Sequence, residues 1–326
     1  MEKQTDIRQA VWSRYWSHGV GHSCGGSYGS SYEGALAAWW RAAFATLAPG
    51  ARVLDIATGN GALPRLLLDF DQAGTLSCDA VDLATLAPAW FAGLAPERAA
   101  RLRFHGKQAA EALPFPDGNF DLVMSQYGLE YTDLARTVPE ILRVLAPGGR
   151  IRLLTHHADA RPVVLAATEL DHMAWMALPG GLLETATALL EPLSRAATEA
   201  GRATLEHDQA AIALRTRFNQ LQPEVTQLAS KSNCPDVLVE TRQAIGAIIN
   251  LALNQGYSLA AESMQKLRLD LTDAKVRLQE LRDYALDQAG VEALCAALAR
   301  GAVKAEFAPI QDQSELMGWI VAIDRA

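Results

Sequence analysis

The sequence predicts an α/β fold with a doubly wound, mostly parallel sheet, a large helical insertion and a C-terminal antiparallel hairpin. Three observations predict it. Short apolar runs alternate with helical patterns over residues 50–157, residues 159–303 are rich in Ala, Leu and Gln, and two strand-like runs follow at 303–310 and 317–323. We expect the hairpin to return to the first sheet, so that the α/β domain is discontinuous in sequence.

The elements of the α/β region follow one another in a regular order. Strands are expected at 52–56, 76–82, 102–104, 120–125 and 150–155, and helices at 35–47, 62–69 and 134–145. Because helical stretches separate the strands, the strands should pair in parallel through right-handed crossovers. This order divides the chain into an aromatic lid segment and helix (1–49), an α/β core (50–158 plus 304–326) and a helical insertion (159–303).

A regular apolar seam marks the insertion. Its residues are spaced alternately three and four apart: Met264, Leu267, Leu271, Ala274, Leu278, Leu281 and Ala285. One interpretation is a helix that packs inside a helical bundle. The other is a coiled coil that joins two copies of the chain as a homodimer. The insertion as a whole is expected to cap a substrate pocket.

Composition excludes several classes of protein. The chain has 326 residues and a formal charge of −8, which disfavours broad binding to nucleic acid. Its 4 cysteines lie far apart without a C-x-x-C pair, so we expect reduced thiols and no metal site. No apolar run approaches the roughly 20 residues that span a bilayer. We therefore expect a cytoplasmic protein without a membrane partner.

A glycine turn after the first strand is the strongest motif. Residues 53–61 read VLDIATGNG, in which Gly59 and Gly61 let a ligand approach the backbone and a following helix offers its N-terminal amides. Asp55 can accept hydrogen bonds from a ligand ammonium group, directly or through water. Pro64 stands where a dinucleotide fingerprint has its third glycine, which disfavours a nicotinamide enzyme. No phosphate-binding G-x-x-x-x-G-K-[ST] loop occurs.

Four segments resemble the class I S-adenosylmethionine-dependent methyltransferases, near the ubiquinone/menaquinone branch. The glycine turn corresponds to the family's D-x-G-x-G-x-G, with Ala57 in place of the first glycine. Residues 80–83 (AVDL) supply the acidic residue at the end of strand two. Residues 111–123 and 142–150 resemble the family's runs into strands four and five. The resemblance implies a Rossmann-like sheet that binds S-adenosylmethionine and releases S-adenosylhomocysteine.

The resemblance also implies the roles of single residues. Asp82 would accept hydrogen bonds from the two ribose hydroxyls, with Asp79 as the less favoured substitute. Ala109 stands where an acidic residue often faces the adenine, and Gln108 could supply an oxygen instead. The expected cofactor contacts are Asp55, Ala57, Gly59, Asn60, Gly61, Asp82, Leu83, Gln108, Ala110, Glu111, Ser125, Gln126 and Tyr127.

Candidates for the methyl-transfer chemistry follow strands four and five. His156 and His157 could act as the base, as could Glu130, and Tyr127 lies in the same region; each could instead be a packing or capping residue. Neighbouring residues of a strand face opposite sides, so only one histidine should face the pocket. The aromatic N-terminal segment could close over the cofactor and supply acceptor contacts, namely Tyr15, Trp16, His18, His22, Tyr28 and Tyr32.

The function predicted from these residues is methyl transfer to an oxygen, nitrogen or carbon atom of a small-molecule acceptor. An aromatic or polyketide-like compound is one such acceptor. Two alternatives stay open. The chain could methylate a protein or peptide, with the insertion as docking surface. It could also be a non-catalytic scaffold or sensor that binds S-adenosylmethionine.

Overall fold

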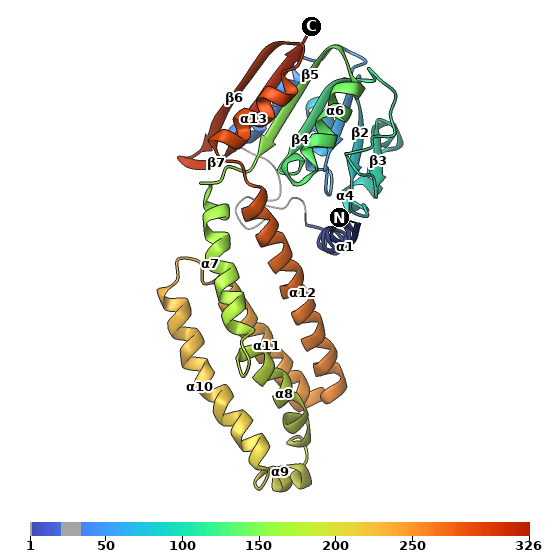
Figure 1. Ribbon diagram of the computed structural model, residues 1–326. Coiled ribbons are helices and arrows are strands. Elements are labelled where there is room, and N and C mark those ends of the chain that lie inside the picture. The colour runs from blue at the N-terminus through green and yellow to red at the C-terminus, as the bar shows by residue number, and fades with distance from the viewer. Residues whose placement is uncertain (1, 21–33) are drawn as a thin grey trace. The chain divides into compact units, whose positions relative to one another are not determined.

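The computed structural model describes residues 2–20 and 34–326 (Figure 1). The chain divides into an α/β unit, Met1–Val163 with Asp283–Ala326, and a helical unit, Val164–Arg282. The helices of the α/β unit are α1 (Glu2–Ser17), α2 (Gly34–Phe44), α3 (Ala62–Phe70), α4 (Ala89–Ala92), α5 (Pro96–Ala99), the 3-10 helix η1 (Leu129–Tyr131), α6 (Leu134–Val144) and α13 (Gln288–Leu298). The helices that make up the helical unit, two of which extend into the α/β unit, are α7 (Arg161–Met176), α8 (Leu182–Arg195), α9 (Glu199–Leu205), α10 (Gln209–Lys231), α11 (Asp236–Gln255) and α12 (Tyr257–Tyr284).

Seven strands form one mixed sheet in the order β3-β2-β1-β4-β5-β7-β6. Their bounds are β1 (Arg52–Ile56), β2 (Ser77–Asp82), β3 (Leu102–Gly106), β4 (Phe120–Gln126), β5 (Leu145–Thr155), β6 (Ala302–Asp312) and β7 (Glu315–Arg325). The first five pair in parallel, whereas β7 runs antiparallel to both β5 and β6. The expected fold class, including the returning hairpin, is confirmed.

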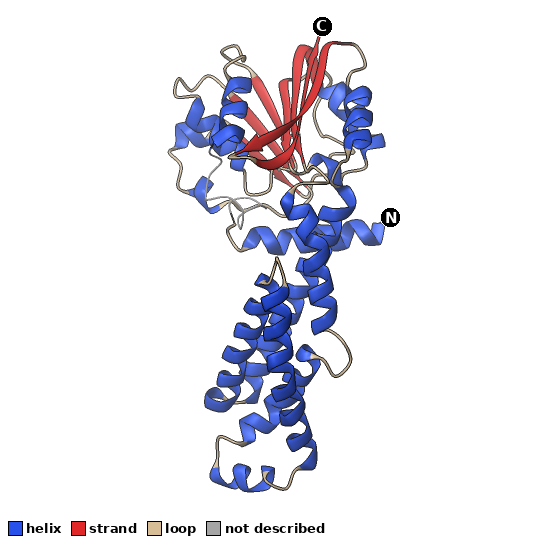
Figure 2. Ribbon diagram, turned by 90° about the vertical axis from the view of Figure 1, so that its left-hand side faces the viewer, coloured by secondary structure: helices blue, strands red, loops and turns tan. Residues whose placement is uncertain are grey.

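Helices cover both faces of this sheet (Figure 2). Side chains alternate between the faces of a strand, so Leu54 and Ile56 pack in one cluster and Val53 in another. The first cluster includes the apolar residues of α6 and α13, and the second includes those of α2 and α3. The doubly wound arrangement therefore follows directly from strands that are apolar on both sides.

The helical unit has an apolar core of its own. Met264, Leu267, Leu271, Ala274 and Leu278 of the predicted seam pack in that core with residues of α8, α10 and α11. This packing corresponds to the bundle interpretation of the seam. Pairing with a second copy through this unit stays a prediction.

The helical region begins and ends at different residues from those we expected. The separate unit is Val164–Arg282, not 159–303, because α13 belongs to the α/β unit. Val291, Leu294 and Leu298 of α13 are buried in the cluster that includes Ile151 and Val321 of the sheet. The apolar face of α13 is plain in the sequence, but its periodicity does not tell which partner it packs against.

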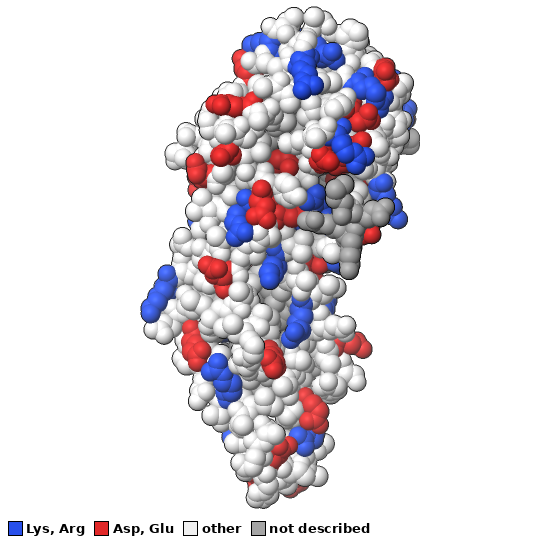
Figure 3. Space-filling view, in the orientation of Figure 1, with Lys and Arg blue, Asp and Glu red and all other residues white. Residues whose placement is uncertain are grey.

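The surface charges and the described helices can be compared with what the composition led us to expect. On the face of the molecule shown in Figure 3, acidic and basic side chains are interspersed. None of the described helices combines the length and the apolar character needed to cross a membrane.

The packing of α13 can be tested with Leu298→Ala. Leu298 is fully buried, so the truncation should destabilise the α/β unit by about 2–5 kcal/mol. In hydrogen exchange, β5 and β7 should lose protection while α8 and α11 keep theirs. Leu221→Ala, in the core of the helical unit, should show the opposite pattern. Loss of protection in α8 and α11 on Leu298→Ala would contradict the assignment.

Candidate cofactor and active site

A pocket opens where the strand order reverses, at the carboxyl ends of the parallel strands. Such switch points are where open α/β sheets bind ligands. The pocket has about 900 Å³ of open space. It is lined by Arg8, Gln9, Trp12, Trp16, Ala57, Thr58, Ala62, Val81, Asp82, Leu83, Ala84, Gln108, Ala109, Ala110, Glu111, Gln126, Tyr127, Gly128, Tyr131 and Thr132.

Asp82, the last residue of β2, organises the floor of this pocket. Its Oδ2 accepts a hydrogen bond from the Gly59 amide and its Oδ1 one from the Ala84 amide, both at 2.8 Å. Burial raises the pKa of this carboxyl group, while the two amides act against the rise. A carboxylate offers about four lone-pair sites, so two remain for a ligand's hydroxyl groups.

Asp55 lies behind the glycine turn and does not line the pocket. Burial raises its pKa to about 8, and the nearby Asp82 carboxylate contributes to the rise. A carboxyl group with this pKa is largely protonated at pH 7. Because Asp55 does not line the pocket, the structure does not present it for direct contact with a ligand ammonium, and a contact through water stays a prediction.

Ala57 holds the position at which the resemblance implies a glycine. Its φ is +57°, a left-handed conformation that costs a non-glycine residue about 1–2 kcal/mol. A Cβ on Gly128 would lie 2.4 Å from the Ala57 Cβ. Gly128 therefore makes room for the methyl group of Ala57, and the two residues form a complementary pair in the pocket wall.

Helix α1 lies over the glycine turn. A Cβ on Gly59 would lie 2.5 Å from the Trp16 ring, and the Asn60 side-chain amide donates to the Trp16 carbonyl at 3.0 Å. Ser13 Oγ accepts from the Thr85 amide at 2.9 Å. Gly59 and Asn60 thus contact α1 instead of lining the pocket.

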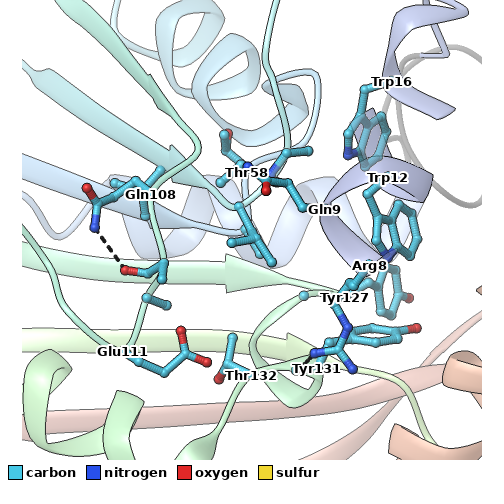
Figure 4. A pocket seen from close by; sticks show the side chains of 18 of the residues that line it. Arg8, Gln9, Trp12, Trp16, Thr58, Gln108, Glu111, Tyr127, Tyr131 and Thr132 are labelled. Atoms are coloured by element: carbon cyan, nitrogen blue, oxygen red, sulfur yellow. Dashed lines mark hydrogen bonds between the residues drawn. The ribbon is translucent and has the colours of Figure 1, made fainter. Parts of the chain in front are cut away.

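Figure 4 shows the two sides of the pocket. Trp12 and Trp16 of α1 stand on one side, with ring centroids 5.7 Å apart, and Gln108 and Glu111 stand on the other. Gln108 Nε2 donates to two carbonyl groups of its own loop, those of Ala109 (3.0 Å) and Ala112 (2.6 Å). The side chain is therefore held at the pocket wall by its own loop.

Four further cofactor candidates have clear positions. Leu83 and Ala110 line the pocket, as expected. Ser125 does not, because its buried hydroxyl donates to the Ile56 carbonyl at 2.7 Å and joins β4 to β1. The space beside Gly61 is filled by Phe104 and Trp90. Ser125 and Gly61 thus hold the sheet and the turn together.

Two of the predicted catalytic residues form a buried pair. Glu130 Oε1 lies 2.8 Å from His156 Nδ1 and also accepts from the His156 amide at 2.8 Å. The His156 ring stacks on Tyr127, with centroids 4.4 Å apart, and its Nδ1 lies 3.4 Å from the Tyr131 hydroxyl. Tyr127 and Tyr131 line the pocket, so the pair lies directly behind its wall.

The other two catalytic candidates have their polar atoms engaged elsewhere. The Tyr127 hydroxyl donates to the Met317 carbonyl at 2.9 Å. His157 stacks on Trp319 at 4.2 Å, and its Nδ1 accepts from the Asp159 amide at 3.0 Å. Burial lowers the pKa of His157. Of the two histidines, His156 therefore lies beside the pocket wall and His157 does not.

The predicted acceptor contacts of the N-terminal segment divide in three. Trp16 lines the pocket. Tyr15 packs on Trp12 and Trp16 without lining it, and His18 is exposed. The remaining three lie outside the described residues: His22, Tyr28 and Tyr32.

Sequence analysis missed several residues of the pocket. Arg8 and Trp12 share a helix face with Trp16, and this spacing of four could have indicated them. Arg8 Nη1 donates to the Tyr131 carbonyl at 2.5 Å, and Nη2 to the Tyr284 hydroxyl at 2.9 Å. No short motif indicated these distant partners.

Comparison with known proteins agrees with this geometry. Residues 54–153 match a family described as a methyltransferase domain. A demethylmenaquinone methyltransferase of Thermus thermophilus is 38% identical over 104 residues, 32% of this chain and 46% of the relative. A ubiquinone/menaquinone biosynthesis C-methyltransferase UbiE of Ectopseudomonas mendocina is 32% identical over 137 residues, 41% of this chain and 53% of the relative. The chain thus spans about half the length of these curated relatives.

A solved structure is similar to part of the chain. The crystal structure of YcgJ from Bacillus subtilis is 27% identical, covers 42% of this chain and 57% of its own, and has a TM-score of 0.33. The sheet order, the glycine turn tied to Asp82 and the matched family define residues 54–153 as a methyltransferase domain of the class I type. That class depends on S-adenosylmethionine.

The complementarity of Ala57 and Gly128 leads to a mutational prediction. Gly128→Ala should destabilise the α/β unit by about 1–3 kcal/mol, because its Cβ would collide with that of Ala57. Adding Ala57→Gly removes that collision and should restore most of the loss. Thermal unfolding of the two single variants and the double variant measures the effect. A double variant no more stable than Gly128→Ala alone would contradict the pairing.

Proposed function

We propose that the protein transfers a methyl group from S-adenosylmethionine to a small-molecule acceptor. The observation that carries the proposal is the Asp82 carboxylate at the pocket floor, held by two amides with lone pairs left for two hydroxyl groups. When bound, S-adenosylmethionine supplies an activated methyl group, and its sulfur keeps the electron pair of the broken bond.

The residues around Asp82 suit the remainder of the cofactor. Leu83, Ala84, Ala109 and Ala110 provide a largely apolar wall next to the carboxylate, of the kind an adenine ring would contact. Helix α1 would shield the reacting atoms from water, since Trp12 and Trp16 lie over this side of the pocket.

The Glu130–His156 pair is our candidate for the proton acceptor. A carboxylate that holds one ring nitrogen of a histidine orients the ring and stabilises its protonated form. With Nδ1 donating its proton to the Glu130 carboxylate, Nε2 is the ring atom that would take the proton of the acceptor. The Tyr131 hydroxyl, 3.4 Å from Nδ1, lies at the pocket wall beside the pair. The net result is one proton moved from the acceptor to Glu130–His156.

The pocket wall favours a flat aromatic acceptor. Trp12, Trp16, Tyr127 and Tyr131 present four aromatic rings to the pocket. The names of the similar proteins, which include demethylmenaquinone and ubiquinone/menaquinone methyltransferases, support the same class of acceptor. We propose a small aromatic compound on these grounds.

One observation favours the non-catalytic alternative. Trp16 packs on Gly59, where the methionine part of the cofactor is expected, and Ala57 replaces a glycine beside it. A scaffold or sensor would bind S-adenosylmethionine without turnover on any acceptor. Three other expectations from the sequence stay predictions. They are a cytoplasmic location, dimerisation through the helical unit, and methylation of a protein as the alternative activity.

Calorimetric titration with S-adenosylmethionine tests the proposal. Wild-type protein should bind it, and Asp82→Ala should bind at least tenfold more weakly, because the ribose hydroxyls lose their acceptor. Asp69→Ala, which removes an exposed carboxylate from the same unit, should leave the affinity unchanged. Absence of binding to folded wild-type protein, or equal binding of NADH, would refute the proposed cofactor.

The role of the buried pair is tested by His156→Gln. Transfer of labelled methyl to a panel of small phenols should fall about 10²–10⁴-fold in kcat, and the pH profile should lose its lower limb. His157→Gln should stay near the wild-type rate, because His157 lies away from the pocket wall. Equal losses in both variants, with unchanged pH profiles, would point to a structural role instead.

A further inference from the structure

Gln126, one of the cofactor contacts expected from the sequence, is a buried polar residue at the pocket. It is the last residue of β4, it is one of the residues that line the pocket, and it is 8% exposed. Its neighbours in the chain have their hydroxyl groups satisfied, Ser125 by the Ile56 carbonyl and Tyr127 by the Met317 carbonyl. Gln126 differs from both because part of its side-chain amide has no hydrogen-bond partner among the described residues.

The orientation of the Gln126 amide follows from its contact with Trp40. The Trp40 indole Nε1 lies 2.5 Å from Gln126 Oε1. An indole N–H can only donate, so the amide must present its oxygen to Trp40. The Nε2 group, which can only donate, is then directed away from Trp40. Trp40 is itself fully buried, so this contact is held in place by the core.

The Nε2 donor has no hydrogen-bond partner among the described residues. Leaving a buried donor unsatisfied is energetically costly, and such groups are rare in native proteins. Gln126 is a lining residue of the pocket, so an atom of a ligand bound there is the partner that we assign to this group. That atom must be a hydrogen-bond acceptor, and in a small organic ligand an oxygen is the usual one.

The position in the sheet indicates which ligand supplies the oxygen. Asp82 ends β2 and Gln126 ends β4, with β1 between them, so the two strands lie about 10 Å apart. Gln126 adjoins Tyr127, whose ring stacks on His156, and both line the pocket together with Tyr131. If Asp82 holds the ribose, as the proposed function requires, Gln126 lies at the part of the pocket where the acceptor would enter.

We propose that Gln126 Nε2 donates a hydrogen bond to an oxygen of the methyl acceptor, so that the pocket selects aromatic compounds bearing a hydroxyl, phenolate or carbonyl oxygen. This inference rests on the proposed function. Trp40 is the positioning residue, because its indole sets which end of the amide faces the pocket. A site built around a buried donor rejects an analogue without the oxygen, because the donor then stays unpaired.

A matched pair of probes tests this selection. 2-Naphthol and 2-methylnaphthalene have similar size and differ in the hydroxyl group. Binding of each to protein saturated with S-adenosylhomocysteine is measured by calorimetry. Wild-type protein should bind 2-naphthol about tenfold more tightly, as expected for one hydrogen bond to an otherwise unsatisfied donor.

Three variants separate the contribution of the Nε2 donor from that of its orientation by Trp40. Gln126→Met keeps the length of the side chain and removes the donor, so the preference for 2-naphthol should fall below about threefold. Gln126→Glu replaces the donor by an oxygen and should weaken 2-naphthol further. Trp40→Phe should give an intermediate preference, because the amide is no longer held in one orientation. Thermal unfolding verifies that each variant is folded.

The affinity for S-adenosylhomocysteine shows whether Gln126 contacts the acceptor or the cofactor. It should be unchanged in Gln126→Met, whereas Asp82→Ala should lose it. A tenfold loss of S-adenosylhomocysteine affinity in Gln126→Met would overturn the proposal and make Gln126 a cofactor contact. Equal binding of the two probes to wild-type protein, or no binding of either, would also overturn it. If wild-type protein fails to bind S-adenosylhomocysteine, the proposed function itself is wrong and this inference falls with it.

Discussion

The hydrogen bonds between Asp82 and the amides of Gly59 and Ala84 are the constraint on which the pocket depends. They join the end of β2 to the turn after β1, so two parallel strands present their following loops at a fixed distance. The buried carboxylate also contributes to the raised pKa of Asp55. One side chain therefore shapes the floor of the pocket, supplies acceptors to a ligand and affects the protonation of a second carboxyl group.

The opposite wall depends on α1, which is attached to three different loops. Asn60 follows β1, Thr85 follows β2 and Tyr131 lies in η1 after β4, and each bonds to a residue of α1. Few of these bonds lie in the hydrophobic core, and segments with such sparse burial open most easily.

The sheet could be predicted from the sequence because strand and helix patterns are local, and the glycine turn with Asp82 could be predicted from the resemblance. The partner of α13 could not be predicted, since its apolar face fits a sheet or a bundle equally well. The roles of Ser125 and Asp55 were also missed, because a strand end can point toward a ligand or toward a neighbouring strand. Arg8 reaches Tyr284 across most of the chain, a contact that no local pattern indicates.

The pairing of β7 between β5 and β6 has a consequence for synthesis of the protein. β5 ends at Thr155, and its antiparallel partner begins at Glu315, roughly 160 residues later. At about 5–20 residues per second, synthesis of this stretch takes roughly 10–30 seconds before that partner can leave the ribosome. During this interval β5 is an open edge, available to chaperones or to wrong partners, while the helical unit, with its own core, is already complete.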